Sequence, residues 1–278
     1  MTDPSQPLFL FGPGYSAQAL AAMWDGPVFG TYRSEASREK LADSTIEPVS
    51  VADEAGLSRA VNGAHLVISV PPTDEGCPAF ALIGAAAAKT ASVTYLSTTG
   101  VYGDLSGGWA MEWSPLKPAS TRARRRVLAE TAWREVGDQV SLVRLPGIYG
   151  PGRSALDRLR SGRARRIIKP GHVFSRAHVD DIASGLKAVI TSSARGVFNL
   201  CDDLAAPPQD VIAFAAELLE MPAPPELRYE DAELSAMAKS FYSECKRVSN
   251  ARLKAATGWR PRYPTYQAGL TAIHAAGG

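Results

Sequence analysis

The chain has 278 residues, of which 45% are hydrophobic and 21% are charged, a composition typical of a globular protein with one large domain or one domain and a smaller lobe. The formal net charge is only +2, so the charge balance does not predict a nucleic-acid partner or an acidic membrane surface. The three cysteines, Cys77, Cys201 and Cys245, lie far apart without metal-ligand spacing, so we expect isolated thiols in a reducing compartment and no metal site.

The N-terminal segment favours a cytoplasmic location. It is polar, with Thr2, Asp3, Ser5 and Gln6, and the apolar run after it is short, which is unlike a signal peptide. No apolar stretch reaches the ~20 residues that cross a bilayer. We therefore expect a soluble cytoplasmic protein with no membrane partner.

The first expected element is a buried strand at Leu8–Phe11, followed by a Gly-x-Gly-x-x-Ala turn and a helix at 18–24. Strand, glycine turn and helix in this order are typical of a dinucleotide-binding site. The first glycine permits the turn, and the second lets a pyrophosphate approach the backbone, where the helix N–H groups would face it. An ordinary strand-to-helix turn is the alternative. The expected cofactor contacts of this turn are Gly12, Gly14, Tyr15 and Ser16.

A second strand, expected at Pro27–Tyr32, ends at Arg33 and Ser34. In a dinucleotide-binding fold the residue at this position contacts the adenosine ribose, and a carboxylate here favours NAD. Arg33 instead suits a 2′-phosphate through charge-assisted hydrogen bonds, and Ser34 adds a hydroxyl donor. We therefore predict NADP as the cofactor, with NAD as the alternative. If Arg33 is only a solvated surface residue, it indicates no preference between the two.

Strands and helices continue to alternate, which predicts a doubly wound parallel sheet of the Rossmann type in an α/β protein. The apolar run His65–Val70 suits a strand buried on both faces, and Pro71 stops it at the edge where such sheets bind ligands. We expect Ser69, Val70 and Pro71 to contact the cofactor. The other elements expected here are strands at Thr45–Val49 and Ser92–Leu96 and helices at about Asp53–Val61 and Ala79–Ala88.

From Leu96 to Asp104 the chain resembles the extended short-chain dehydrogenase/reductase family, whose sugar-nucleotide members include epimerases and dehydratases. The resemblance gives Thr98 the role of bonding a substrate oxygen. It covers residues 8 to about 270, because further segments match in the family's order. These segments are Arg144–Gly152, His178–Ala183, Asn199–Asp203 and Thr257–Pro261.

The resemblance also implies the domain organisation. Residues 1–152, with return segments at about 176–204, would form the NAD(P)-binding Rossmann domain. Residues 153–175 and 205–278 would form a small C-terminal substrate-binding lobe. Pro146 and Gly147 would lie beside the nicotinamide.

The chain departs from the family at the helix that carries the catalytic Tyr-x-x-x-Lys. Counting back from Glu130 places Arg122 at the tyrosine and Arg126 at the lysine. Arginine is protonated at physiological pH, so Arg122 cannot shuttle a proton, while Arg126 can still donate to a ribose or phosphate. The pattern resembles the atypical branch of the family, whose members lack the tyrosine and are largely of undefined function.

Three interpretations follow from this replacement. In the first, Tyr102 or Tyr149 supplies the proton and Thr98 relays it. In the second, the protein is a non-catalytic NADP(H)-binding regulator or redox sensor. In the third, Arg122 and Arg126, which share a helix face at i, i+4 spacing, hold an anionic substrate.

The expected lobe supports the third interpretation. Arg176 lies near an arginine that some family members place on a substrate diphosphate. The segment from 153 to 175 is basic, and a subset of its cations facing the cleft would suit a phosphorylated or nucleotide-linked small molecule; a solvated surface is the alternative. The basic residues singled out there are Arg158, Arg160, Arg163, Arg165, Arg166 and Lys169.

Taken together, these observations predict an NADP(H)-binding protein that resembles nucleoside-diphosphate-sugar epimerases, dehydratases and reductases. The expected activity is that of an oxidoreductase acting on a small anionic substrate. The resemblance further implies a homodimer through the helices at about 79–88 and 120–135, although the arginines of the second helix oppose it.

Overall fold

A parallel sheet of seven strands forms the body of the computed structural model, which describes residues 5–277. The strand order is β11-β7-β5-β4-β1-β2-β3, and every neighbouring pair runs parallel. The chain order therefore reverses between β1 and β4, which is where sheets of this kind bind ligands. The strands are β1 (Leu8–Phe11), β2 (Val28–Tyr32), β3 (Ile46–Ser50), β4 (His65–Ile68), β5 (Ser92–Thr98), β7 (Val140–Leu145) and β11 (Gly196–Asn199).

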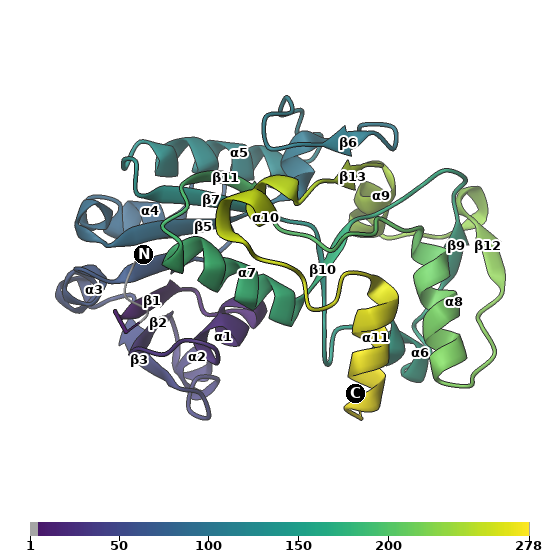
Figure 1. Cartoon of the computed structure of the whole chain (residues 1–278), viewed down its shortest axis with the longest axis horizontal. Helices are drawn as coiled ribbons and strands as arrows, with labels where there is room; N and C mark the ends of the chain where they lie inside the picture. The colour runs from purple at the N-terminus through teal and green to yellow at the C-terminus, as the bar shows by residue number, and fades with distance from the viewer. Residues whose placement is uncertain (1–4, 278) are drawn as a thin grey trace.

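Helices cover both faces of the sheet (Figure 1). Strand β1 is apolar at every position because Leu8 and Leu10 join the core on one face while Phe9 and Phe11 join the core on the other. The predicted doubly wound α/β fold is confirmed. The helices packed on the first face are α1 (Tyr15–Ala21), α7 (Val179–Thr191) and α10 (Ala251–Thr257), and those on the second are α3 (Glu54–Val61), α4 (Pro78–Ile83) and α5 (Thr121–Arg134).

One expected helix is shorter in the structure. The alanine-rich stretch expected to be helical over Ala79–Ala88 forms α4, which ends at the C-cap Gly84, and then a separate 3-10 turn at Ala86–Lys89. Glycine is a poor helix former, so the helix breaks there despite the surrounding alanines. The short helix α2 (Glu35–Glu39) follows β2 and ends at the C-cap Lys40.

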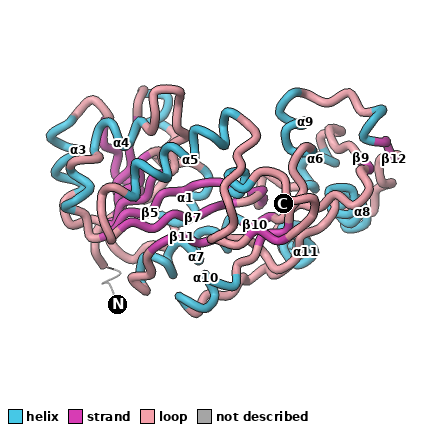
Figure 2. The backbone as a smooth tube through the Cα atoms, turned by 90° about the horizontal axis from the view of Figure 1, so that it is seen from above, coloured by secondary structure: helices cyan, strands magenta, loops and turns pink. Residues whose placement is uncertain are grey.

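A further apolar core lies beyond the carboxyl ends of the sheet strands, where α6, α8 and α11 pack together. Figure 2 shows these helices set apart from the sheet. The domain boundaries that we expect from the sequence stay a prediction. The elements of this region are α6 (Ala155–Arg160), β9 (Arg166–Ile168), α8 (Pro208–Leu218), β12 (Glu226–Arg228), α9 (Ala236–Tyr242) and α11 (Tyr266–Ala275).

Two small parallel pairs connect the body to this lobe. They are β8 (Gly147–Tyr149) with β10 (Arg176–His178), and β6 (Trp109–Ala110) with β13 (Arg247–Val248). Between residues 5 and 277 no helix is long and apolar enough to cross a bilayer, and no cluster of His, Cys, Asp or Glu there is arranged to hold a metal ion. Thr2 and Asp3, which contribute to the polar N-terminus, and Gly278, the last residue of the expected lobe, lie outside the described residues.

Candidate functional site

The turn between β1 and α1 depends on glycine at its first position. Gly12 has φ +78°, and an added Cβ would lie 2.9 Å from the Val70 side chain. The Gly12 N–H donates to Thr31 Oγ1 at 2.8 Å, and its carbonyl accepts from Ser69 Oγ at 2.8 Å. The turn is therefore held by β2 and by the end of β4, and the structure brings Gly12, Ser69 and Val70 together. Their contact with a cofactor stays a prediction. Pro71 follows them and is exposed.

Gly14, the second glycine of the turn, leaves open space beside its backbone. Gly14 is the N-cap of α1, in an extended conformation, and an added Cβ would meet no atom closer than 3.7 Å. Ser16 is buried under the turn. The Tyr15 hydroxyl donates to the Pro151 carbonyl at 2.9 Å, and its ring lies 5.8 Å from the Arg153 guanidinium. Tyr15 thus ties the turn to the loop that leads into the lobe.

Arg33 and Ser34 are exposed at the end of β2. Their backbone N–H groups donate to Ser37 Oγ at 3.0 and 2.9 Å, which fixes the backbone at the start of α2. The Arg33 side chain forms no ion pair within the described chain, and the only nearby carboxylate in sequence, Glu35, pairs with Arg38 at 3.1 Å. Arg33 is accordingly available to an anion at this edge of the sheet.

The two arginines of α5 differ in what they contact. Arg126 donates to the Leu96 carbonyl and lies 5.7 Å from the Tyr95 ring, so it braces the end of β5. Arg122 is exposed and lies 5.2 Å over the Phe241 ring of α9. Thr98, where β5 ends, is half-buried and accepts from the Gly100 N–H at 3.2 Å.

Tyr102 does not reach the substrate region, which corrects our expectation for it. Its side chain is fully buried. Its hydroxyl donates to Asn199 Oδ1 at 2.7 Å and accepts from Arg144 Nη1 at 2.9 Å, and burial raises its pKa. Arg144 in turn pairs with Glu130 through two hydrogen bonds of 3.0 and 2.6 Å. Tyr102 is therefore part of a buried network that joins α5 to the sheet, because these partners come from other elements and turn its hydroxyl inward.

Tyr149 is placed differently. It lines the large cavity described below, and its buried hydroxyl has no hydrogen-bond partner among residues 5–277. Burial, followed by the nearby carboxyl of Asp202, raises the pKa of Tyr149 well above its usual range, and burial raises the pKa of Asp202 itself to about 8. The phenol therefore keeps its proton near neutral pH and is a weak acid. Its hydroxyl lies against α11, where a Cβ added to Gly269 would be 2.1 Å from it.

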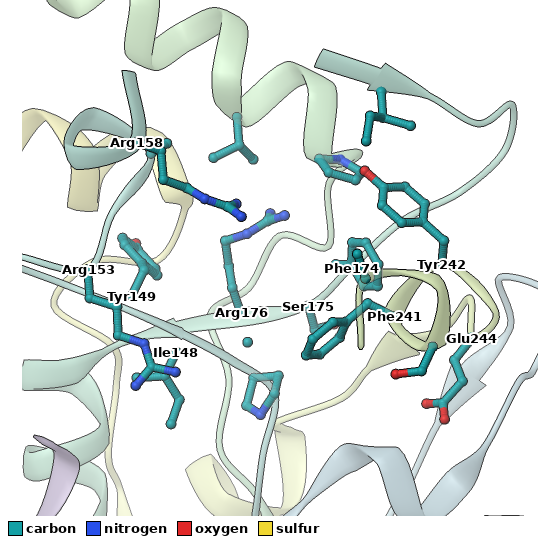
Figure 3. Close-up of a pocket in the computed structure, with 18 of the residues that line it drawn as sticks. Ile148, Tyr149, Arg153, Arg158, Phe174, Ser175, Arg176, Phe241, Tyr242 and Glu244 are labelled. Carbon is teal, nitrogen blue, oxygen red and sulfur yellow. The ribbon is translucent and has the colours of Figure 1, made fainter. Parts of the chain in front are cut away.

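A cavity of about 940 Å³ separates the carboxyl edge of the sheet from the lobe. Thr98, Pro146 and Gly147 line it from the sheet side, and Phe174, Phe241 and Tyr242 line it from the lobe side. Figure 3 shows the guanidinium groups of Arg158 and Arg176 extending into the space between them. The arginines that line it are Arg122, Arg153, Arg158, Arg163, Arg165 and Arg176, and none of these six pairs with a carboxylate within the described chain.

Arg176 is half-buried, and the Nη1 end of its guanidinium is out of contact with solvent. One of its terminal nitrogens, Nη2, donates to the Ala206 carbonyl at 3.2 Å, while Nη1 has no partner. Its guanidinium lies 5.5 Å from the Tyr266 ring, and burial lowers its pKa. A cation with a buried, unpaired donor is costly unless a partner neutralises it.

The basic segment divides between the cavity and other surfaces. Arg158, Arg163 and Arg165 line the cavity, whereas Arg166 pairs with Glu226 at 3.0 Å. Sequence reasoning did not identify the aromatic residues of the lobe or Asp202 as site residues. The segment composition signalled the arginines, but nothing in the sequence signalled that α9 brings two aromatic rings to the same cavity.

No family model matches this chain, but solved structures and curated proteins are similar to it. A functionally unknown conserved protein from Silicibacter pomeroyi DSS is 44% identical, with 98% of this chain and 99% of that chain covered and a TM-score of 0.90. A human epimerase family protein, solved with NADPH, is 17% identical over 96% of this chain and 99% of that chain, with a TM-score of 0.75.

One curated relative is a 3-diazoavenalumate denitrifying reductase from a Streptomyces species, 28% identical over 143 residues. The match takes in 46% of this chain and 45% of the reductase, so the chain spans less than half of that relative's length. The near-complete match at 44% identity shows that this chain belongs to the same family as the conserved S. pomeroyi protein, with the extended short-chain dehydrogenase/reductase fold of the epimerases and dehydratases.

Proposed function

We propose that this protein binds a nicotinamide dinucleotide, with NADP(H) preferred over NAD(H), and acts as an oxidoreductase on a small anionic substrate in the cavity. The glycine turn lies at the point where the strand order reverses, which supports dinucleotide binding. The exposed, unpaired Arg33 supports the preference for a 2′-phosphate. The structural relative solved with NADPH and the curated reductase agree with this assignment.

The observation that carries the substrate assignment is Arg176. It is half-buried, one of its donors is unpaired, and it lines the cavity next to the expected nicotinamide position at Pro146 and Gly147. The acidic group with the largest electrostatic effect on Arg176 is Asp202, whose pKa burial raises to about 8, and the two side chains form no ion pair within the described chain. An anion in the cavity would supply the missing partner.

The bound dinucleotide would supply a hydride. In our proposal Thr98 orients a substrate carbonyl by donating its hydroxyl proton in a hydrogen bond. Water in the cavity supplies the proton that reduction requires, because the Tyr149 hydroxyl is buried against α11 and its raised pKa makes it a weak acid. Arg122 stays protonated and contributes charge only. Arg126 holds the end of β5 through Leu96, which is a positioning role.

The same two arginines favour a second candidate function, a non-catalytic NADP(H)-binding regulator. Arginine at both positions of the usual catalytic pair removes the family's acid/base, and Arg126 is already engaged by the backbone. Such a protein would bind NADPH with similar affinity but would not consume it.

Consumption of NADPH with a panel of carbonyl-bearing acids separates the two candidates. We expect oxidation with at least one anionic compound, a loss of about 10- to 100-fold in kcat/KM for Arg176→Gln because a charge-assisted hydrogen bond is removed, and little change for Arg160→Ala. Arg160 is an exposed arginine of α6 that does not line the cavity, so it is the matched control. NADPH binding without oxidation by any compound supports the regulator, and an unaffected Arg176→Gln variant rejects the substrate assignment.

A further inference from the structure

Three aromatic side chains of the lobe form one side of the cavity, and we call Phe174, Phe241 and Tyr242 the aromatic wall. The wall is supported from behind. The His172 ring lies 4.6 Å from Phe174 in an edge arrangement and stacks on Tyr242 at 5.3 Å. Tyr229 lies 5.3 Å from Tyr242 on another side. The rings of Phe174 and Tyr242 are thus fixed by their neighbours before any ligand arrives.

One supporting ring, that of His172, is neutral, while the Lys169 ammonium lies 4.7 Å over the Tyr229 ring and donates to the Tyr242 carbonyl. His172 is buried, and burial lowers its pKa to about 4, so its ring is neutral near neutral pH. The Phe174 backbone is pinned to Ala206 by a pair of hydrogen bonds of 3.1 and 3.0 Å. A rigid aromatic surface is suited to a planar apolar ring, which aromatic side chains hold by stacking or edge contacts.

The opposite side of the cavity is basic. Figure 3 places Arg153, Arg158 and Arg176 across the cavity from the aromatic wall. These guanidinium groups have no carboxylate partner within residues 5–277. A ligand that fills the cavity therefore meets rings at one end, where Arg122 lies 5.2 Å over Phe241, and further unpaired positive charge at the other.

Polar side chains beside the wall are already engaged within the protein. Ser175 Oγ accepts from the Val248 N–H at 2.9 Å, and the Glu244 carboxylate pairs with Lys246 at 2.6 Å. Ser235 Oγ accepts from the Ala238 N–H at 3.2 Å. Each of these contacts uses an acceptor of its side chain, so the two serine hydroxyls keep a proton that can be donated to a polar ring edge. A nucleobase is therefore a competing occupant, whereas the aromatic faces of the wall favour a planar apolar ring.

We propose that the substrate is an aromatic acid, with its planar ring on the aromatic wall and its anionic group on Arg158 and Arg176. This inference rests on the proposed function, because it concerns the same cavity. A carboxylate and a phosphate share the chemistry that the arginines recognise, and the two are separate arms of the test. A nucleoside diphosphate is the competing ligand.

The test measures calorimetric binding to the protein saturated with NADP⁺, using probes matched in size and charge. We expect 3-phenylpropanoate to bind about 3- to 10-fold more tightly than 3-cyclohexylpropanoate, from the aromatic contacts. The neutral 3-phenylpropanamide should lose about tenfold or more, because the arginines lose their anion. Phenyl phosphate in place of the carboxylate identifies which anion the arginines prefer.

Variants of the wall tie the effect to these residues. Phe241→Leu and Phe174→Leu should bring the phenyl-to-cyclohexyl ratio close to one without changing NADP⁺ affinity. Trp109→Leu is the control, since Trp109 is an exposed aromatic residue outside the cavity lining. Phe241 is 46% exposed, so its variant should fold even where Phe174→Leu does not.

Three results would overturn the inference. The first is equal binding of the phenyl and cyclohexyl acids, the second is UDP binding more tightly than 3-phenylpropanoate, and the third is no measurable binding of either aryl anion to NADP⁺-saturated protein. In each case bound NADP⁺ leaves the cofactor part of the proposed function in place. Failure to bind NADP⁺ at all contradicts the proposed function itself.

Discussion

The glycine turn after β1 and the arginine-bearing start of α5 lie on the same edge of the sheet, yet they follow their family's pattern to different degrees. At the turn, backbone groups form the expected dinucleotide-binding site. The positive φ of Gly12 and the open face of Gly14 are enforced by contacts with β2 and β4. At α5 side chains make the site, and Arg122 is exposed on the helix surface.

The difference teaches which parts of such a site can change without cost to the fold. Helix α5 is anchored by features that do not involve Arg122. Its Ser120 N-cap accepts from the Ala123 N–H at 3.2 Å, and its buried Glu130 pairs with Arg144. An exposed residue on this scaffold can be exchanged freely, so the fold is evidence for dinucleotide binding and says little about the reaction.

The largest expected effect comes from breaking the scaffold of α5. Glu130→Ala leaves Arg144 as a buried charge without its partner, because both side chains are about 1–2% exposed. We expect a loss of roughly 3–5 kcal/mol in the free energy of unfolding, measured by urea denaturation. Glu135→Ala, at the exposed end of the same helix, is the control. A loss below about 1 kcal/mol would mean that α5 is held by other contacts.

The two glycines of the turn offer a matched pair with smaller effects. Gly12→Ala imposes a positive φ on a side chain and crowds Val70, so we expect a destabilisation of about 1–3 kcal/mol. Gly14→Ala should leave stability within about 0.5 kcal/mol, since space surrounds the added methyl group. Both variants should bind NADPH at least about tenfold more weakly. Gly12→Ala distorts the turn, and the new methyl group of Gly14→Ala occupies the path of the pyrophosphate. Unchanged NADPH affinity in Gly14→Ala would separate the turn from the cofactor.

Much of the body could be predicted from the sequence, because its signals are local. The four apolar residues of β1 and the glycines after it are contiguous, and the parallel topology brings Ser69 and Val70 to the same place. The inward direction of Tyr102 could not be predicted, since Arg144 and Asn199 come from β7 and β11, distant in sequence. The aromatic wall was also missed, because its residues come from two segments that meet only through the fold of the lobe.

A pH experiment tests whether His172 is neutral within the lobe's aromatic cluster. Burial lowers the pKa of His172 to about 4 in the folded protein, below the usual 6.5. The unfolded chain therefore binds a proton that the folded protein excludes, and His172 should cost stability as the pH falls from about 6.5 to about 4.

Asp202 has the opposite slope, because its raised pKa means that folded protein holds a proton which the unfolded chain loses as the pH rises. The informative quantity is therefore the difference in unfolding free energy between the wild type and His172→Phe. This difference should shift in favour of the variant as the pH falls through that window. A constant difference would show that the ring of His172 takes up a proton in place.

The central claim is that Arg33, at the end of β2, makes the protein prefer NADPH over NADH. Calorimetric titration of the wild type and Arg33→Ala with both dinucleotides measures this preference. We predict that the wild type binds NADPH about tenfold or more tightly than NADH, through the charge-assisted bonds of Arg33 to the 2′-phosphate. Arg33→Ala should bind the two with nearly equal affinity. Equal affinity already in the wild type, or no binding of either dinucleotide, would contradict the account.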